Sequence, residues 1–145
     1  MRFLGVDHGS KRIGLASGDE LGLATPLPAL VQPDPAARWT ALLTEIANRR
    51  IHEVVMGHPI NMDGSAGPKA REVEAFAERL RVTTSLPVHL IDERLTSHAA
   101  EATLPKHKLR ELRSTGEVDS RAAAIILQDY LDQRFPAPLP EEDSF

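Results

Sequence analysis

Short apolar runs separated by turn residues dominate the first part of the chain. The runs Phe3–Val6 and Ile13–Ala16 flank a turn signal at residues 9–11, and this order predicts a β-hairpin. The next segment, residues 21–30, contains two prolines, so it can form only an edge strand or an extended connector. We expect these three segments to form a three-strand meander.

The apolar spacing changes to a helical period after Asp34 and Pro35, which provide a helix start. This helix is expected to end near Arg50. Further helices are predicted from Pro68 to just before Leu86, over about 96–104, and over about 118–134. Between them, the apolar run 53–57 has no alternation, which is typical of a parallel strand covered on both faces, and 88–91 forms a second such short strand.

This order of elements predicts an α/β fold with a five-stranded mixed sheet, in which a three-strand meander and two parallel strands are flanked by helices. One domain is expected over residues 1–135, followed by a disordered, proline-rich acidic tail over 136–145. If the first, fourth and fifth strands are parallel, their carboxyl ends share the edge where open α/β sheets place ligands. Asp7 and Glu93, at two of these strand ends, should then converge.

Composition narrows the class of protein. The 145 residues include no cysteine, which removes disulfides and thiolate zinc sites and is compatible with a reducing cytosol. No apolar stretch approaches a membrane span, and the first residues do not resemble a secretion signal, so we expect a soluble cytoplasmic protein without membrane partners. The net charge of −4 means that any binding of nucleic acid must be local.

Carboxylates at element ends suggest a metal site. Asp7 and Glu93 follow strands, and Asp119 begins the last helix. Without cysteine or a close-spaced histidine pair, such oxygen ligands favour Mg²⁺ or Mn²⁺ over zinc. Two of these acids also have a structural alternative: Asp7 could initiate a turn, and Asp119 could cap a helix, a role worth about 0.5 to 2 kcal/mol.

Four segments carry a family resemblance, in order and spacing over nearly the whole chain: GVDHGSKRIGLA, GHPINMDGSAGPKA, DERLTS and VDSRAAAIILQDYL. They resemble the YqgF family of bacterial RNase H-like proteins, described as nucleases of the precursor of 16S ribosomal RNA and related in fold to Holliday junction resolvases. The resemblance implies that Asp7, Glu93 and Asp119 are catalytic acids. They would hold one or two Mg²⁺ or Mn²⁺ ions for phosphodiester hydrolysis that leaves a 5′ phosphate.

His8 departs from the family, which often has a hydrophobic or small residue after the first Asp. We interpret it as an exposed turn variant, the alternative being a proton shuttle or metal neighbour. Weaker candidates for nucleic-acid contact lie in basic or loop positions. They are Lys11, Arg12, Asn61, Arg94 and, in the basic segment 105–113, Lys106, Lys108 and Arg110.

Several alternatives stay open at this point. Arg94 could instead hold Asp92 or Glu93 in place, and the basic segment could be a solvated surface. Aromatic residues are scarce, so no platform for stacking bases is evident, and recognition should rely on backbone and shape. The substrate could be precursor rRNA or a four-way DNA junction, and the protein could act as a homodimer. A phosphotransferase and a non-catalytic nucleic-acid-binding module are the rival classes.

The basic segment generates a first prediction. Replacing Lys106, Lys108 and Arg110 with Ala should weaken nucleic-acid binding across all sequences, because phosphate contacts carry no sequence information. Each lost contact contributes about 0.9 to the slope of log affinity against log salt on duplex DNA, so titrations at several salt concentrations should show a slope flatter by up to about 3. An unaltered slope would move the binding surface to Lys11, Arg12 and Lys69.

Overall fold

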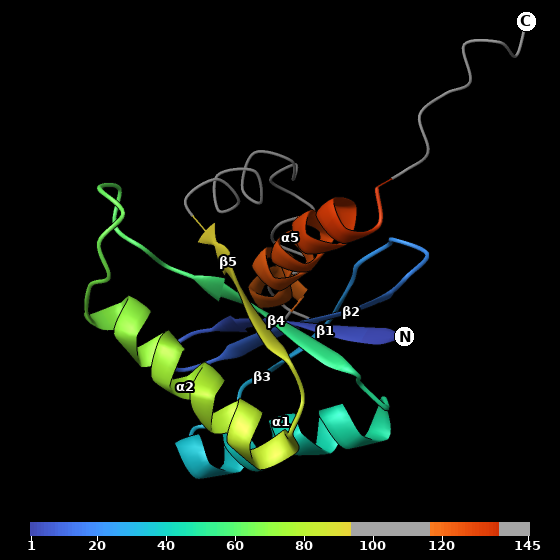
Figure 1. Ribbon diagram of the computed structural model, residues 1–145. Coiled ribbons are helices and arrows are strands. Elements are labelled where there is room, and N and C mark those ends of the chain that lie inside the picture. Colours follow the sequence, from blue (N-terminus) through green and yellow to red (C-terminus); the bar gives the residue numbers. More distant parts are fainter. Residues whose placement is uncertain (94–116, 137–145) are drawn as a thin grey trace, which may run out of the picture.

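The computed structural model describes residues 1–93 and 117–136, which form a five-stranded sheet with helices on both faces (Figure 1). Strands β1 (Arg2–His8), β2 (Ile13–Asp19) and β3 (Thr25–Leu30) form an antiparallel meander. Strands β4 (Glu53–His58) and β5 (Val88–Asp92) continue the sheet in parallel with β1, in the order β3-β2-β1-β4-β5. The predicted mixed sheet is confirmed, with the proline-containing β3 at its edge.

Three helices in the described part of the chain cover the sheet. Helix α1 (Pro35–Asn48) follows the N-cap Asp34, and α2 (Pro68–Thr84) ends at a left-handed Ser85; both lie on one face. Helix α5 (Glu117–Arg134) lies on the other face (Figure 1). Within 1–93 and 117–136, none of the helices is both long and apolar enough to cross a bilayer. The helix expected over about 96–104 and the tail expected beyond Pro136 lie outside the described residues.

The alternation of β1 divides the core into two parts. Leu4 and Val6 point toward α1 and α2 and pack with buried residues of those helices, such as Leu42. Phe3 points the other way and packs with Leu127 of α5. Both layers therefore depend on β1. The same alternation decides to which face of the sheet each residue at the carboxyl end of β1 points.

Helix α5 approaches the sheet unusually closely because glycines lie beneath it. A Cβ atom added to Gly5 would lie 2.8 Å from both the Ala123 carbonyl oxygen and the Leu127 Cβ. A Cβ atom added to Gly18 would lie 2.9 Å from the Leu131 Cδ1. At Gly5 the helix backbone is thus in direct contact with the strand, and at Gly18 the leucine side chains of α5 rest on the strand backbone.

A buried hydrogen bond fixes the beginning of α5. The pairing between β2 and β3 shifts its register between Ile13 and Leu15. The Leu15 backbone N–H donates to the Ser120 Oγ at 3.1 Å, and the Ser120 side chain is fully buried. Since Leu15 is the partner of Val6 in β1, this bond holds the first turn of α5 one residue from the position of Asp7.

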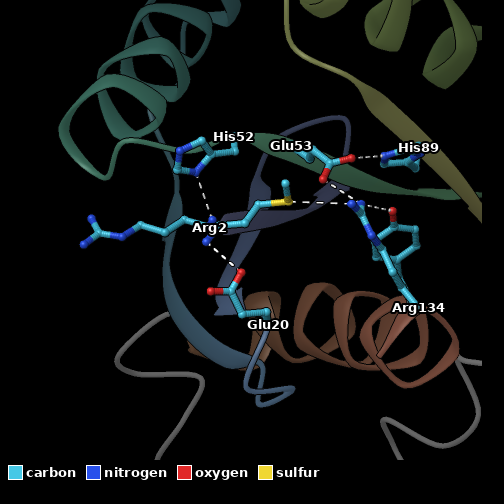
Figure 2. Close-up of polar contacts among 8 residues, drawn as sticks. Arg2, Glu20, His52, Glu53, His89 and Arg134 are labelled. Atoms are coloured by element: carbon cyan, nitrogen blue, oxygen red, sulfur yellow. Dashed lines mark hydrogen bonds and ion pairs between the residues drawn. The ribbon is translucent and has the colours of Figure 1, made fainter. Parts of the chain in front are cut away.

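An ionic cluster fixes the C-terminal end of α5 near the point where the parallel strands β4 and β5 begin (Figure 2). Glu53, which begins β4, is hydrogen-bonded to the His89 Nε2 at 2.8 Å and accepts from the Arg134 Nη1 at 2.6 Å. Burial opposes ionisation of Glu53, but these two hydrogen bonds and the charges of Arg134 and His89 together outweigh it and hold the pKa of Glu53 below its ordinary value. The cluster joins α5, β4 and β5.

The bond to Ser120 generates a stability prediction. Ser120→Ala should lower the free energy of unfolding by about 1 to 3 kcal/mol, because it leaves the buried Leu15 N–H without its acceptor. Urea unfolding followed by circular dichroism measures the change. Thr40→Ala is the matched control, since its hydroxyl bonds to Ala36 on the exposed side of α1, and its loss should be within about 0.5 kcal/mol. Equal losses in both variants would contradict the assignment.

Candidate active site

The carboxyl ends of β1, β4 and β5 place two predicted acids together. Asp7 lies next to last in β1 and, by alternation, faces α5. Glu93 directly follows β5, whose last residue pairs with His58 at the end of β4. The Asp7 and Glu93 side chains are joined by a hydrogen bond. The convergence expected from the parallel arrangement is therefore present for these two acids.

The environment of Glu93 favours its protonated form. Burial makes the largest contribution, and the negative charge of Asp7 and the hydrogen bond between the two side chains add to it. Asp92 acts in the same direction, whereas the positive charge of Lys69 opposes the shift. The result is a pKa of about 7, raised from 4.5. Near neutral pH, the two carboxyl groups thus share a proton in the absence of a cation.

Gly57 provides the space that the Glu93 side chain occupies. A Cβ atom at this position of β4 would overlap the Glu93 carboxyl group and would lie 2.6 Å from the Ile126 Cδ1. The pairing of Gly57 with Ile91 places this glycine beside β5. Gly57 had no predicted role, although a glycine at the end of a buried strand is the signal of such a close approach.

Asp119 is placed only by its backbone, which lies in the first turn of α5. The neighbouring Ser120 contacts Leu15, so this turn is close to the strand end that carries Asp7. The Asp119 side chain is outside the described part of the chain. Among the side chains that are described, no group of three His, Cys, Asp or Glu residues forms a metal site. The described donors are two carboxylates, a set that suits Mg²⁺ or Mn²⁺.

The remaining predicted residues have different surroundings. Lys11 and Arg12 are exposed in the turn between β1 and β2. The Asn61 Nδ2 donates to the Ser65 Oγ at 3.1 Å, which shows that this side chain helps to hold the loop after β4. Four candidates lie outside the described residues. They are Arg94, Lys106, Lys108 and Arg110.

The interpretation of His8 as an exposed turn residue is wrong. Strand β1 continues through His8, and alternation turns the half-buried ring toward α2, where it lies 4.3 Å from the Phe76 ring centroid. The ring is therefore on the opposite face of the sheet from Asp7. Burial, followed by the positive charge of Lys69, lowers the pKa of His8.

Lys69 acts electrostatically on two groups at the carboxyl ends of the parallel strands, Glu93 on one face of the sheet and His8 on the other. Its charge stabilises the ionised form of Glu93 and disfavours the charged form of His8. Lys69 had no predicted role in the acidic site. The signal that could have found it is its position in the first turn of α2, immediately after the loop that follows β4.

Comparison with known proteins adds a family and a fold. The sequence profile of the RuvX family, described as "Holliday junction resolvase", matches residues 1–133. A protein from Opitutus terrae, named "Putative pre-16S rRNA nuclease", is 62% identical over 141 residues, which cover 97% of each chain.

Two solved structures share the fold. The Fowlpox virus resolvase with its substrate Holliday junction DNA has a TM-score of 0.60 at 10% identity, over 92% of this chain and 99% of that one. The Thermus thermophilus RuvC in complex with Holliday junction substrate has a TM-score of 0.56 at 17% identity, over 94% and 96%. At these identities the likeness concerns the fold, which is RNase H-like as predicted.

The raised pKa of Glu93 predicts a pH dependence of stability. Between pH 4.5 and about 7, Glu93 is ionised in the unfolded chain and protonated in the native one, so unfolding releases a proton and raising the pH destabilises the metal-free protein. Glu93→Gln removes this contribution. Melting temperatures measured in EDTA should therefore show a gain for Glu93→Gln over the parent that is larger at pH 8 than at pH 4. A gain that stays constant with pH would contradict the shift.

Proposed function

Since this chain belongs to the RuvX family, whose profile covers residues 1–133, we propose that it is a divalent-cation-dependent nuclease that processes the 5′ end of pre-16S rRNA in the cytoplasm. Support for this substrate comes from the name of the Opitutus terrae relative, which is similar over nearly the full length of both chains. The proposed reaction is hydrolysis of a phosphodiester bond, in which water adds to phosphorus and the 3′ oxygen departs.

The observation that carries the proposal is the hydrogen-bonded pair of Asp7 and Glu93. Burial and mutual repulsion make this arrangement unfavourable for two ionised carboxylates, as the raised pKa of Glu93 shows. Functional sites commonly retain buried groups with strongly shifted pKa values although these lower stability. A module that only binds nucleic acid has no need for such a pair. The pair therefore supports catalysis over the alternative of a non-catalytic nucleic-acid-binding module.

Asp7 and Glu93 would hold the cation, with Asp119 as the third ligand that the family resemblance implies. A bound Mg²⁺ or Mn²⁺ would supply an activated water and would stabilise charge on the departing oxygen. The protein residues do the positioning. Gly57 keeps space for the Glu93 carboxyl group, and Lys69 favours its ionised form.

A second substrate, the four-way DNA junction, is favoured by the family description and by the shared fold with junction resolvases. Purified protein should therefore be incubated with labelled 16S rRNA leaders and with four-way junctions, each with and without Mg²⁺ or Mn²⁺. Cation-dependent cleavage of the leader that leaves 5′ phosphates supports the proposal, and cleavage of the junction alone would transfer the activity to DNA. No cleavage of either would contradict a nuclease function.

Asp7→Asn should lower the rate of cation-dependent cleavage by about two orders of magnitude or more, because it removes an anionic ligand with little change in shape. Single-turnover rates at saturating Mg²⁺ measure the effect. In EDTA the variant should melt at a higher temperature than the parent at neutral pH, since Asn does not repel Glu93.

Asp19→Asn is the matched control for this change. Asp19 ends β2 at the opposite edge of the sheet, where its Oδ1 accepts from the Leu21 N–H, a bond that Asn can also accept. Cleavage should proceed at the parental rate in this variant. A parental rate in Asp7→Asn would exclude Asp7 as a ligand in the reaction.

A further inference from the structure

A recess of about 210 Å³ lies beneath the turn between β1 and β2, on the face of α1 and α2. The side chains that matter in its wall are His8, Arg38, Trp39, Phe76 and Arg79. A second recess of about 460 Å³, with Lys11 and Arg12 in its wall, adjoins it through Arg38. Both recesses are therefore at the same edge of the sheet as Asp7, but on the other face.

Arg38 brings an uncompensated positive charge to both recesses. Its side chain is only 7% exposed, and its guanidinium donates to three backbone carbonyl groups: Gln32 at 2.6 Å, Pro33 at 3.2 Å and Ser10 at 3.1 Å. These acceptors are neutral, and among residues 1–93 and 117–136 no carboxylate forms an ion pair with Arg38. Buried charges in proteins are usually paired, so this one favours an external anion.

Arg79 presents a second guanidinium, and aromatic rings hold it in place. Its Cζ lies 3.9 Å from the centroid of the Trp39 ring. Trp39 contacts Phe76 edge-on at 5.3 Å, and Phe76 contacts His8. In the described part of the chain, neither a carboxylate nor a carbonyl group accepts from Arg79. A planar guanidinium held in this way keeps its outer edge available for a phosphate and loses little freedom on binding.

Among the described residues that line the recesses there is one acid, and it does not cancel these charges. Glu72 lines the smaller recess, and its Oε2 lies 3.8 Å from the Lys69 Nζ, so the charge of Lys69 partly offsets it. Four cationic side chains line the two recesses of a chain whose net charge is −4. They are Lys11, Arg12, Arg38 and Arg79. Such a local concentration of positive charge suits a polyanion.

We propose that these recesses bind the phosphodiester backbone of the substrate strand next to the cut, with Arg79 as the contacting residue and Arg38 as the buried charge behind it. The inference rests on the proposed function for the identity of the polyanion. Asp7 and His8 are consecutive and face opposite sides of β1, so a strand that crosses this edge reaches both the acidic pair and the recess.

The test measures binding without cleavage, in the Asp7→Asn background and in EDTA, with a fluorescent RNA oligonucleotide of the 16S leader. Adding Arg79→Ala should raise the dissociation constant about tenfold or more, the effect of one charge-assisted contact. The slope of log affinity against log salt should fall by about 0.7 to 0.9, which corresponds to one phosphate. Arg79 is exposed, so circular dichroism should show a folded variant.

Arg50→Asn is the matched control, because it removes one exposed cation next to the opposite edge of the sheet, and Asn tolerates its positive φ of 53°. Equal losses in the Arg79 and Arg50 variants would overturn the inference. Full affinity in Arg79→Lys would also overturn it, since a lysine supplies the charge without the planar stacked group. If binding depends on Arg79 but the parent protein cuts no substrate, the nuclease function is refuted and the inference about the recesses stands.

Discussion

The close contact between α5 and the sheet is the constraint on which the candidate site depends. Gly5 and Gly18 allow the helix backbone to approach β1 and β2, and the buried bond from Leu15 to Ser120 fixes where the helix begins. At the other end, the ion pair between Arg134 and Glu53 prevents the helix from tilting away. With both ends held, the first turn of α5 stays close to the strand end that carries Asp7.

This rigid frame explains how two carboxylates that repel each other stay together. Neither Asp7 nor Glu93 can move far, since one belongs to a central strand and the other fills the space above Gly57. The native fold therefore carries an electrostatic cost at this edge, and packing elsewhere offsets it. A site that is assembled in advance in this way needs little reorganisation when a cation arrives.

The elements and their order could be predicted from the sequence because apolar runs, prolines and turn residues are local signals. Even the meeting of Asp7 and Glu93 followed from the parallel strands alone. The strand limits were too short, as β1 extends to His8, and this hid the face on which His8 lies. The contact of Trp39 with Arg79 could not be predicted, because these residues are 40 positions apart in sequence and meet only through the way α1 and α2 pack on one sheet.

The alternation at the end of β1 has an evolutionary consequence. Asp7 and His8 serve different faces only while the strand keeps its register against β2 and β4. A slip by one residue would exchange their faces at once, and the acidic pair and the aromatic support of Arg79 would be lost together. Insertions or deletions upstream in this strand should therefore be eliminated by selection even where the sheet could still form, so the length of β1 is itself a functional trait.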